Sequence, residues 1–110
     1  MSISATIAIN ASLSDSINLG GGKLAGIQMS AAWTAAVITF QGSEDGTTFY
    51  DLYDRYGSEI SWTVVAGKLH CNDDVVPFLS IRFLKVRSGT TASAVTQEAA
   101  RTLGIITNAV

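Results

Sequence analysis

The chain has 110 residues, a net charge of −2 at pH 7, 47% hydrophobic residues and 15% charged residues. This composition excludes an intrinsically disordered chain, and the slight acidity excludes a basic nucleic-acid-binding domain or a polybasic membrane anchor. No apolar run approaches the ~20 residues of a membrane-spanning helix, and the first residues do not resemble a signal peptide. We expect one domain over residues 1–110, synthesised in a cytoplasm. The low fraction of charged residues indicates that a partner covers part of the surface of this domain.

Alternating apolar and polar residues, broken by glycine and polar clusters, predict a succession of short strands. In chain order, strands are expected at residues 3–9, 16–19, 23–29, 36–41, 47–53, 58–65, 68–71, 80–87 and 101–107. A bend or short helical turn is expected around Pro77, and an extended or irregular path over residues 92–100.

Short strands with a turn every eight to twelve residues predict an all-β protein, a two-sheet antiparallel β-sandwich of about eight to nine strands. The aliphatic residues are expected to form its core together with five aromatic residues: Trp33, Phe40, Phe49, Trp62 and Phe83. The clearest turn lies at residues 42–46. We expect Asp45 and Gly46 to be structural there, with Gly46 at positive φ.

The sequence contains few of the residues that usually act in catalysis. The single histidine, His70, and the single cysteine, Cys71, are adjacent, and neighbouring strand residues point to opposite faces. We expect a buried thiol and an exposed imidazole, and solvated carboxylates at Glu44, Glu59 and Glu98. The sequence therefore predicts no enzyme, no catalytic residues and no cofactor.

Metal binding is predicted to be absent. The candidate oxygen ligands are Asp45, Asp51, Asp54, Asp73 and Asp74, and none follows the spacing of a calcium-binding loop. Turn chemistry explains them better, with a calcium ion in a loop as the less favoured alternative. One histidine and one cysteine argue against zinc.

The cationic side chains near the end of the chain allow two interpretations. Long cationic stems such as those of Lys85 and Arg87 can cover apolar surface at a strand end, which is the favoured interpretation. Alternatively, Arg87 and Arg101 bind carboxylates across an interface.

Two segments resemble a known fold family. Residues 40–50 read FQGSEDGTTFY, and residues 81–87 read IRFLKVR. Both are similar to strands of galactose-binding-like jelly rolls, in which an Asp-Gly turn is followed by a threonine and an aromatic residue. The resemblance implies that the sandwich is of jelly-roll type.

A second resemblance covers nearly the whole chain. Residues 24–54 and 83–90, continuing through Gln97 to Leu103, look like small structural proteins of tailed phages and prophages. This resemblance implies a virion component, foremost a capsid decoration (cement) protein. Such a protein would form a homotrimer on the capsid surface and bind the major capsid protein, with neither nucleic acid nor membrane as a partner.

The residues expected at such an interface are Ile3, Ile7, Tyr56, Arg87, Arg101 and Val110. For the apolar residues inside strands, pairing within the sandwich is the favoured alternative. A different function is a carbohydrate-binding or tail-fibre adhesion module, since the same fold binds sugars through aromatic residues. Of the candidates for that role, Trp33, Tyr56 and Trp62, we expect Tyr56 to be the most exposed.

Overall fold

The computed structural model describes residues 3–72 and 76–108 and confirms the predicted all-β sandwich. Two antiparallel sheets face each other, one of four strands and one of five. Within these described residues, the strands and a short 3-10 helix (η1) are β1 (Ile3–Ile7), β2 (Ile17–Asn18), β3 (Lys23–Gln28), β4 (Ile38–Ser43), β5 (Tyr50–Asp51), β6 (Ser61–Trp62), β7 (Leu69–Cys71), η1 (Val76–Phe78), β8 (Phe83–Ser88) and β9 (Arg101–Asn108). The described residues contain no helix long and apolar enough to cross a membrane.

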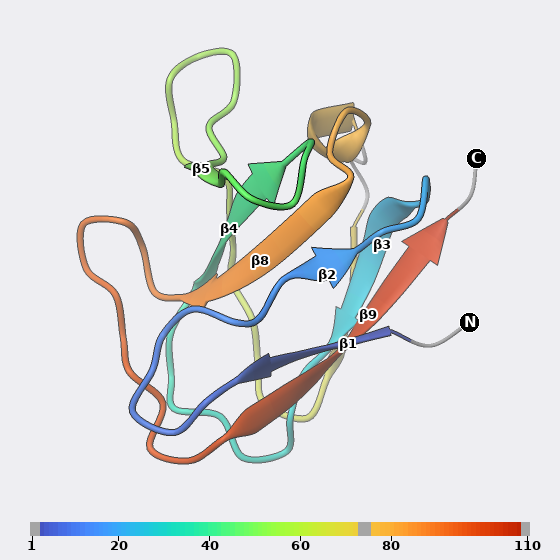
Figure 1. Ribbon diagram of the computed structural model, residues 1–110. Coiled ribbons are helices and arrows are strands. Elements are labelled where there is room, and N and C mark those ends of the chain that lie inside the picture. The colour runs from blue at the N-terminus through green and yellow to red at the C-terminus, as the bar shows by residue number, and fades with distance from the viewer. Residues whose placement is uncertain (1–2, 73–75, 109–110) are drawn as a thin grey trace.

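The order of strands in the two sheets is that of a jelly roll. The four-stranded sheet runs β1-β9-β3-β7, and the five-stranded sheet runs β2-β8-β4, with β5 and β6 both paired to β4. Each sheet thus alternates early and late strands, so the chain folds back on itself as two interlocked Greek keys. Figure 1 shows β1, β9 and β3 side by side, with β2, β8 and β4 in the other layer.

The core lies between the sheets and follows from the alternation within each strand. Ile7, Leu24 and Leu103 point inward from the four-stranded sheet, and Ile38 and Leu84 point inward from the five-stranded sheet, all fully buried. Burying one such side chain contributes about 1.5–3 kcal/mol through the apolar area removed from water.

The aromatic part of the core differs from the prediction. Phe40 and Trp62 pack as expected, with ring centroids 5.3 Å apart, but their third partner is Phe78, which the sequence analysis did not single out. Phe49 and Phe83 are instead half-buried, because Phe83 shares the outer face of β8 with Lys85, whose ammonium lies over the Phe49 ring. The 3-10 helix Val76–Phe78, which contains Pro77, places Phe78 in the buried core, and no strand periodicity indicates this position.

Several strands are shorter than their alternation predicts. β1 ends at Ile7, because the chain turns at Asn10, whose φ is 64°, and this leaves Ile9 exposed. β5 and β6 contain only two residues each, since the chain between them leaves the sheet. The connection through residues 20–22 carries the chain from β2 in one sheet to β3 in the other.

Asp15 covers one point on the outer edge of β1. β1 pairs with β9 on one side only, and Thr6 directs its backbone groups to the other side. There the Thr6 N–H donates to Asp15 Oδ1 and the Thr6 carbonyl accepts from the Asp15 N–H. Asp15 therefore occupies both backbone groups of Thr6 on this edge.

Candidate interaction surface

A buried arginine organises the outer face of the five-stranded sheet. Arg87 stands on β8 opposite Thr39 of β4, on the face directed away from the core. It is only 8% exposed. A buried guanidinium requires compensating partners, because its desolvation costs several kcal/mol.

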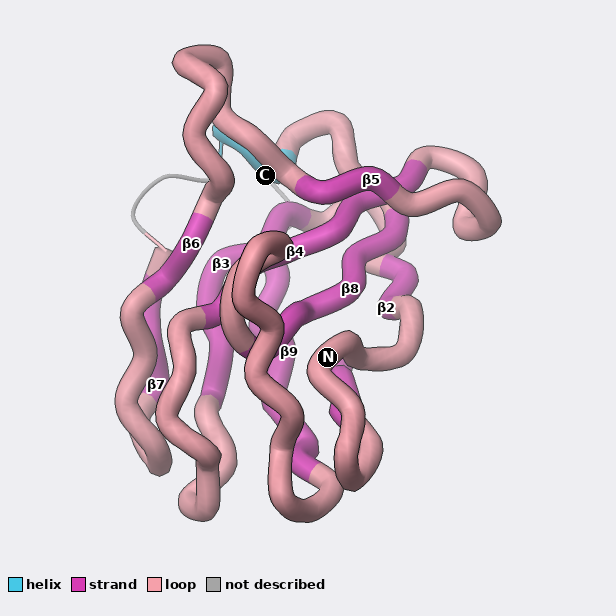
Figure 2. The backbone as a smooth tube through the Cα atoms, turned by 90° about the vertical axis from the view of Figure 1, so that its left-hand side faces the viewer, coloured by secondary structure: helices cyan, strands magenta, loops and turns pink. Residues whose placement is uncertain are grey.

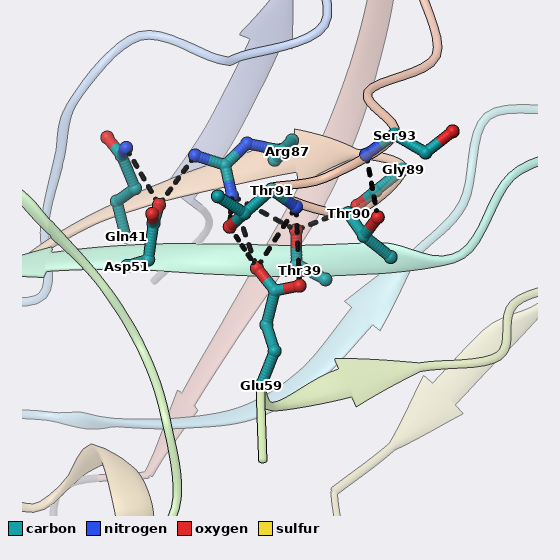
Figure 3. Close-up of polar contacts among 9 residues, drawn as sticks. All are labelled: Thr39, Gln41, Asp51, Glu59, Arg87, Gly89, Thr90, Thr91 and Ser93. Carbon is teal, nitrogen blue, oxygen red and sulfur yellow. Dashed lines mark hydrogen bonds and ion pairs between the residues drawn. The ribbon is translucent and has the colours of Figure 1, made fainter. Parts of the chain in front are cut away.

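Two carboxylates supply this compensation from different segments (Figure 3). Asp51 Oδ1 lies 2.6 Å from Arg87 Nη2, and Glu59 Oε2 lies 3.4 Å from Arg87 Nη1. Arg87 Nη1 also donates to Thr91 Oγ1 at 2.9 Å, and Gln41 Nε2 donates to Asp51 Oδ1 at 3.1 Å. The cluster therefore joins β4, β5, β8 and two loops at one guanidinium.

The position of Glu59 corrects the expectation that this side chain is solvated. Its carboxylate accepts from the Thr91 N–H at 3.2 Å and from the Thr91 hydroxyl, besides binding Arg87. Glu44 and Glu98 are exposed, as expected. The sequence signal for Glu59 was weak, because its partners Arg87 and Thr91 lie about thirty residues away.

The cluster also lowers the pKa of the Asp51 carboxyl. The hydrogen bond from Arg87, reinforced by the bond from Gln41, holds the pKa of the Asp51 carboxyl below its ordinary value. Asp51 is therefore ionised throughout the neutral range, and it binds Arg87 as a carboxylate.

After Asp51 the chain forms a projecting hairpin, residues 52–60, which includes Glu59 and which we call the arm. It stands out beyond the five-stranded sheet in both views (Figures 1 and 2). The Ile60 N–H donates to the Leu52 carbonyl at its base, and Tyr53 bridges to Glu59 above it. Leu52 and Ile60 pack against the core, so the base of the arm is anchored by apolar contacts as well.

Exposed tyrosines mark the arm and the strand that leads into it. Tyr50, Tyr53 and Tyr56 are 69%, 52% and 78% exposed. Arg55 lies 5.0 Å from the centroid of the Tyr56 ring and donates to its hydroxyl. The expected exposure of Tyr56 is observed, whereas Tyr50 and Tyr53 were not singled out, because their alternation resembled that of a longer strand.

The turn at Asp45 and Gly46 is held by a dense set of hydrogen bonds. Gly46 has a φ of 79°, and its N–H donates to Ser43 Oγ at 3.0 Å. Asp45 Oδ1 accepts from the N–H groups of Thr48 and Thr47, and these bonds lower the pKa of the Asp45 carboxyl. The turn thus has the backbone geometry that the sequence analysis expected at Gly46.

An open hollow lies beside this turn. Its volume is about 490 Å³, and its lining includes Glu44, Asp45, Tyr50, Leu52 and Ile81. The lining of the hollow thus combines two acidic residues and an exposed tyrosine with the apolar residues Leu52 and Ile81.

Three of the expected interface residues are engaged within the chain. Ile7 is fully buried between the sheets, and Arg87 is enclosed by its own carboxylates, so neither side chain offers a surface to a partner. Ile3 is half-buried, pairs with Ile105 and packs against the core. Val110 lies outside the described residues.

Arg101 also binds within the chain, through a residue that the sequence analysis missed. Its Nε donates to Gln97 Oε1 at 3.1 Å, and its Nη2 lies 3.4 Å from Thr34 Oγ1. Gln97 is fully buried and donates to Ser88 Oγ at 2.7 Å and to the Thr34 carbonyl at 3.1 Å. Its position in a stretch without periodicity gave no signal of this role.

His70 and Cys71 reverse the expected pattern of burial. Cys71 is exposed on the edge strand β7, whereas His70 is half-buried. The Val65 N–H donates to His70 Nε2 at 2.9 Å, which fixes the imidazole against the chain after β6. The two side chains do point to opposite faces, so they form no catalytic pair.

Within residues 3–72 and 76–108, no three His, Cys, Asp or Glu side chains come together as a metal site. Asp73 and Asp74 lie outside the described residues. Compared with known proteins, the chain matches no family model and no curated protein.

Proposed function

We propose that this chain is a structural protein of a tailed-phage particle, a capsid decoration protein that binds and stabilises the head lattice. The observation that carries the proposal is the resemblance of residues 24–54 and 83–103 to small structural proteins of tailed phages. The jelly-roll order of the strands agrees with it, because this architecture recurs in viral capsid domains.

The shape of the molecule supports a binding role on a lattice. A buried ionic cluster fixes the loops on the outer face of the five-stranded sheet, and these loops present exposed aromatic side chains. Rigid surfaces lose little conformational entropy on binding, so more of the contact energy is retained as affinity.

The mechanism follows from binding linkage. A protein that binds only the assembled shell stabilises it by RT ln(1 + [L]/Kd), about 2.7 kcal/mol per site at a hundredfold excess over Kd. We propose a homotrimer, because closed symmetric oligomers match the symmetry axes of a lattice and bridge neighbouring subunits of the major capsid protein.

The experiment compares heads that lack the chain with heads to which the purified protein has been added back. We expect saturable binding at hundreds of copies per head, trimers by native mass spectrometry, and a higher temperature of head disruption. Equal disruption temperatures, or recovery of the protein only in the tail fraction, would refute the capsid proposal.

A second candidate function is a carbohydrate-binding or tail-fibre adhesion module. The observation that favours it is the hollow of about 490 Å³ beside Tyr50, where Glu44 and Asp45 offer oxygen acceptors to hydroxyl groups. Saccharide binding that Tyr50→Ala abolishes, without binding to heads, would establish this function instead.

A further inference from the structure

The arm, residues 52–60, is held at both of its ends by one side chain. Asp51 directly precedes the arm and binds Arg87 Nη2, while Glu59 lies at its far end and binds Arg87 Nη1. Because the two carboxylates use different nitrogens, the guanidinium fixes the separation of the two ends. Figure 3 shows both carboxylates directed at Arg87.

The tip of the arm has an ordered turn of its own. Asp54 Oδ1 accepts from the N–H groups of Tyr56 and Ser58, and the Asp54 N–H donates to the Ser58 carbonyl at 2.8 Å. Gly57 completes the turn with a φ of 86°. The arm is thus a rigid hairpin whose orientation depends on its two ends.

The side chains on the arm are of the kind that anchor protein interfaces. Tyrosine and arginine are enriched among residues that dominate binding energy, and Tyr53, Arg55 and Tyr56 are all exposed. The arm projects from the sheet, and its tip residues Arg55, Tyr56 and Gly57 are not among the residues that line the hollow beside Tyr50. A projecting tip suits insertion into a hollow of another protein, whereas saccharides bind in concave sites.

We propose that the arm is the surface that contacts the capsid protein, and that Arg87 is the positioning residue that presents it. This inference rests on the proposed function, and names the element that carries it out. The partner is a protein surface with hollows that accept the rings of Tyr53 and Tyr56. The ion pairs of Arg87 pre-organise the arm, so its ordering does not have to occur on binding.

The first test removes the two rings. Tyr53→Ser combined with Tyr56→Ser is expected to weaken binding to purified heads about tenfold or more, as the loss of hot-spot residues does. The matched control is Leu69→Ser combined with Ile106→Ser, two exposed apolar residues on the four-stranded sheet, which is expected to bind like the unmodified chain. Circular dichroism of both variants verifies that each retains the β-sandwich.

The second test releases the ends of the arm. Asp51→Asn combined with Glu59→Gln removes both ion pairs, and we expect faster tryptic cleavage after Arg55 and faster hydrogen exchange that is most pronounced in residues 52–60. Head binding is expected to weaken in parallel. Glu98→Gln makes the same carboxylate-to-amide change at an exposed position and is expected to leave the cleavage rate, exchange and binding unchanged.

The outcomes separate the two proposals. If the unmodified chain does not bind heads, the proposed function is refuted. If it binds heads and the tyrosine variant binds equally well, or if the tyrosine variant loses only affinity for a saccharide, the role of the arm is refuted. If the Asp51 and Glu59 variant keeps slow cleavage and full head binding, Arg87 has no positioning role.

Discussion

Gly46 lies directly against the ring of Phe83, and a Cβ atom at this position would stand 3.2 Å from Phe83 Cζ. The backbone there also has a φ of 79°, a conformation that β-branched residues resist. Two independent constraints therefore favour glycine at this position.

We expect Gly46→Val to lower the free energy of unfolding by about 1–2 kcal/mol, because the strained backbone and the Phe83 contact both oppose it. This corresponds to several degrees in the thermal midpoint, measured by circular dichroism. Thr47→Val, a change to the same residue at the adjacent exposed position, is the control and is expected to leave the midpoint nearly unchanged. An unaltered midpoint for Gly46→Val would show that the turn adapts.

Replacing Arg87 by methionine is expected to destabilise the chain strongly, because it leaves Asp51 and Glu59 without their cation. Breaking a buried ion pair costs roughly 3–5 kcal/mol, and we expect the lower end since Asp51 keeps part of its exposure. Urea unfolding measures the effect. Adding Asp51→Asn and Glu59→Gln to Arg87→Met should recover part of the loss, whereas Arg82→Met, at an exposed position, should have little effect.

Stability is expected to fall as the pH drops below about 4. The folded pKa values of Asp45 and Asp51 lie below the value of about 3.9 of an unfolded aspartate, so the unfolded chain binds more protons in acid. Their contribution is complete above about pH 4 and is lost as the pH falls through the folded pKa values. The free energy of unfolding, measured with urea at several pH values between 2 and 6, should change less with pH for Asp51→Asn than for Glu98→Gln. An equal dependence on pH in the two variants would contradict the role of Asp51.

Gln97→Met keeps most of the side-chain volume and removes four hydrogen bonds to Thr34, Ser88 and Arg101. We expect a loss of about 2 kcal/mol or more, since each buried polar group left without a partner costs roughly 1–3 kcal/mol. Differential scanning calorimetry should detect it. Glu98→Met also introduces a methionine, but at the adjacent exposed position. Comparing the two variants separates the effect of the lost hydrogen bonds from the effect of introducing a methionine.

The core between the sheets was largely predictable, because the alternation of apolar and polar residues along a strand indicates which of its faces is buried. Leu84 and Val86 point inward, while Lys85 and Arg87 point outward, as the period of two requires. Phe78 was not predictable in this way, since a 3-10 turn carries it and no period includes it. Phe49 and Phe83 were assigned to the core on residue type alone, although tertiary packing uses them to cover the outer face.

The polar clusters were less predictable than the core. Arg87 binds carboxylates 36 and 28 residues away in the chain, and Gln97 reaches Thr34 across 63 residues. Such partners become neighbours only after the jelly-roll order is known, because each sheet pairs early strands with late ones. The tip of the arm falls in the gap between the expected strands 47–53 and 58–65, but the alternation of residues 47–65 gave no sign that the hairpin leaves the sheet.

The closure of the β1 edge by Asp15 has a consequence for how molecules of this protein meet. An added strand at this edge would have to displace both backbone hydrogen bonds of Thr6, which discourages the edge-to-edge pairing that leads to aggregates. Backbone pairing is indiscriminate, because every polypeptide offers the same groups. Because the backbone groups of Thr6 are already hydrogen-bonded, recognition at this point of the edge depends on side chains, which differ from one protein to the next.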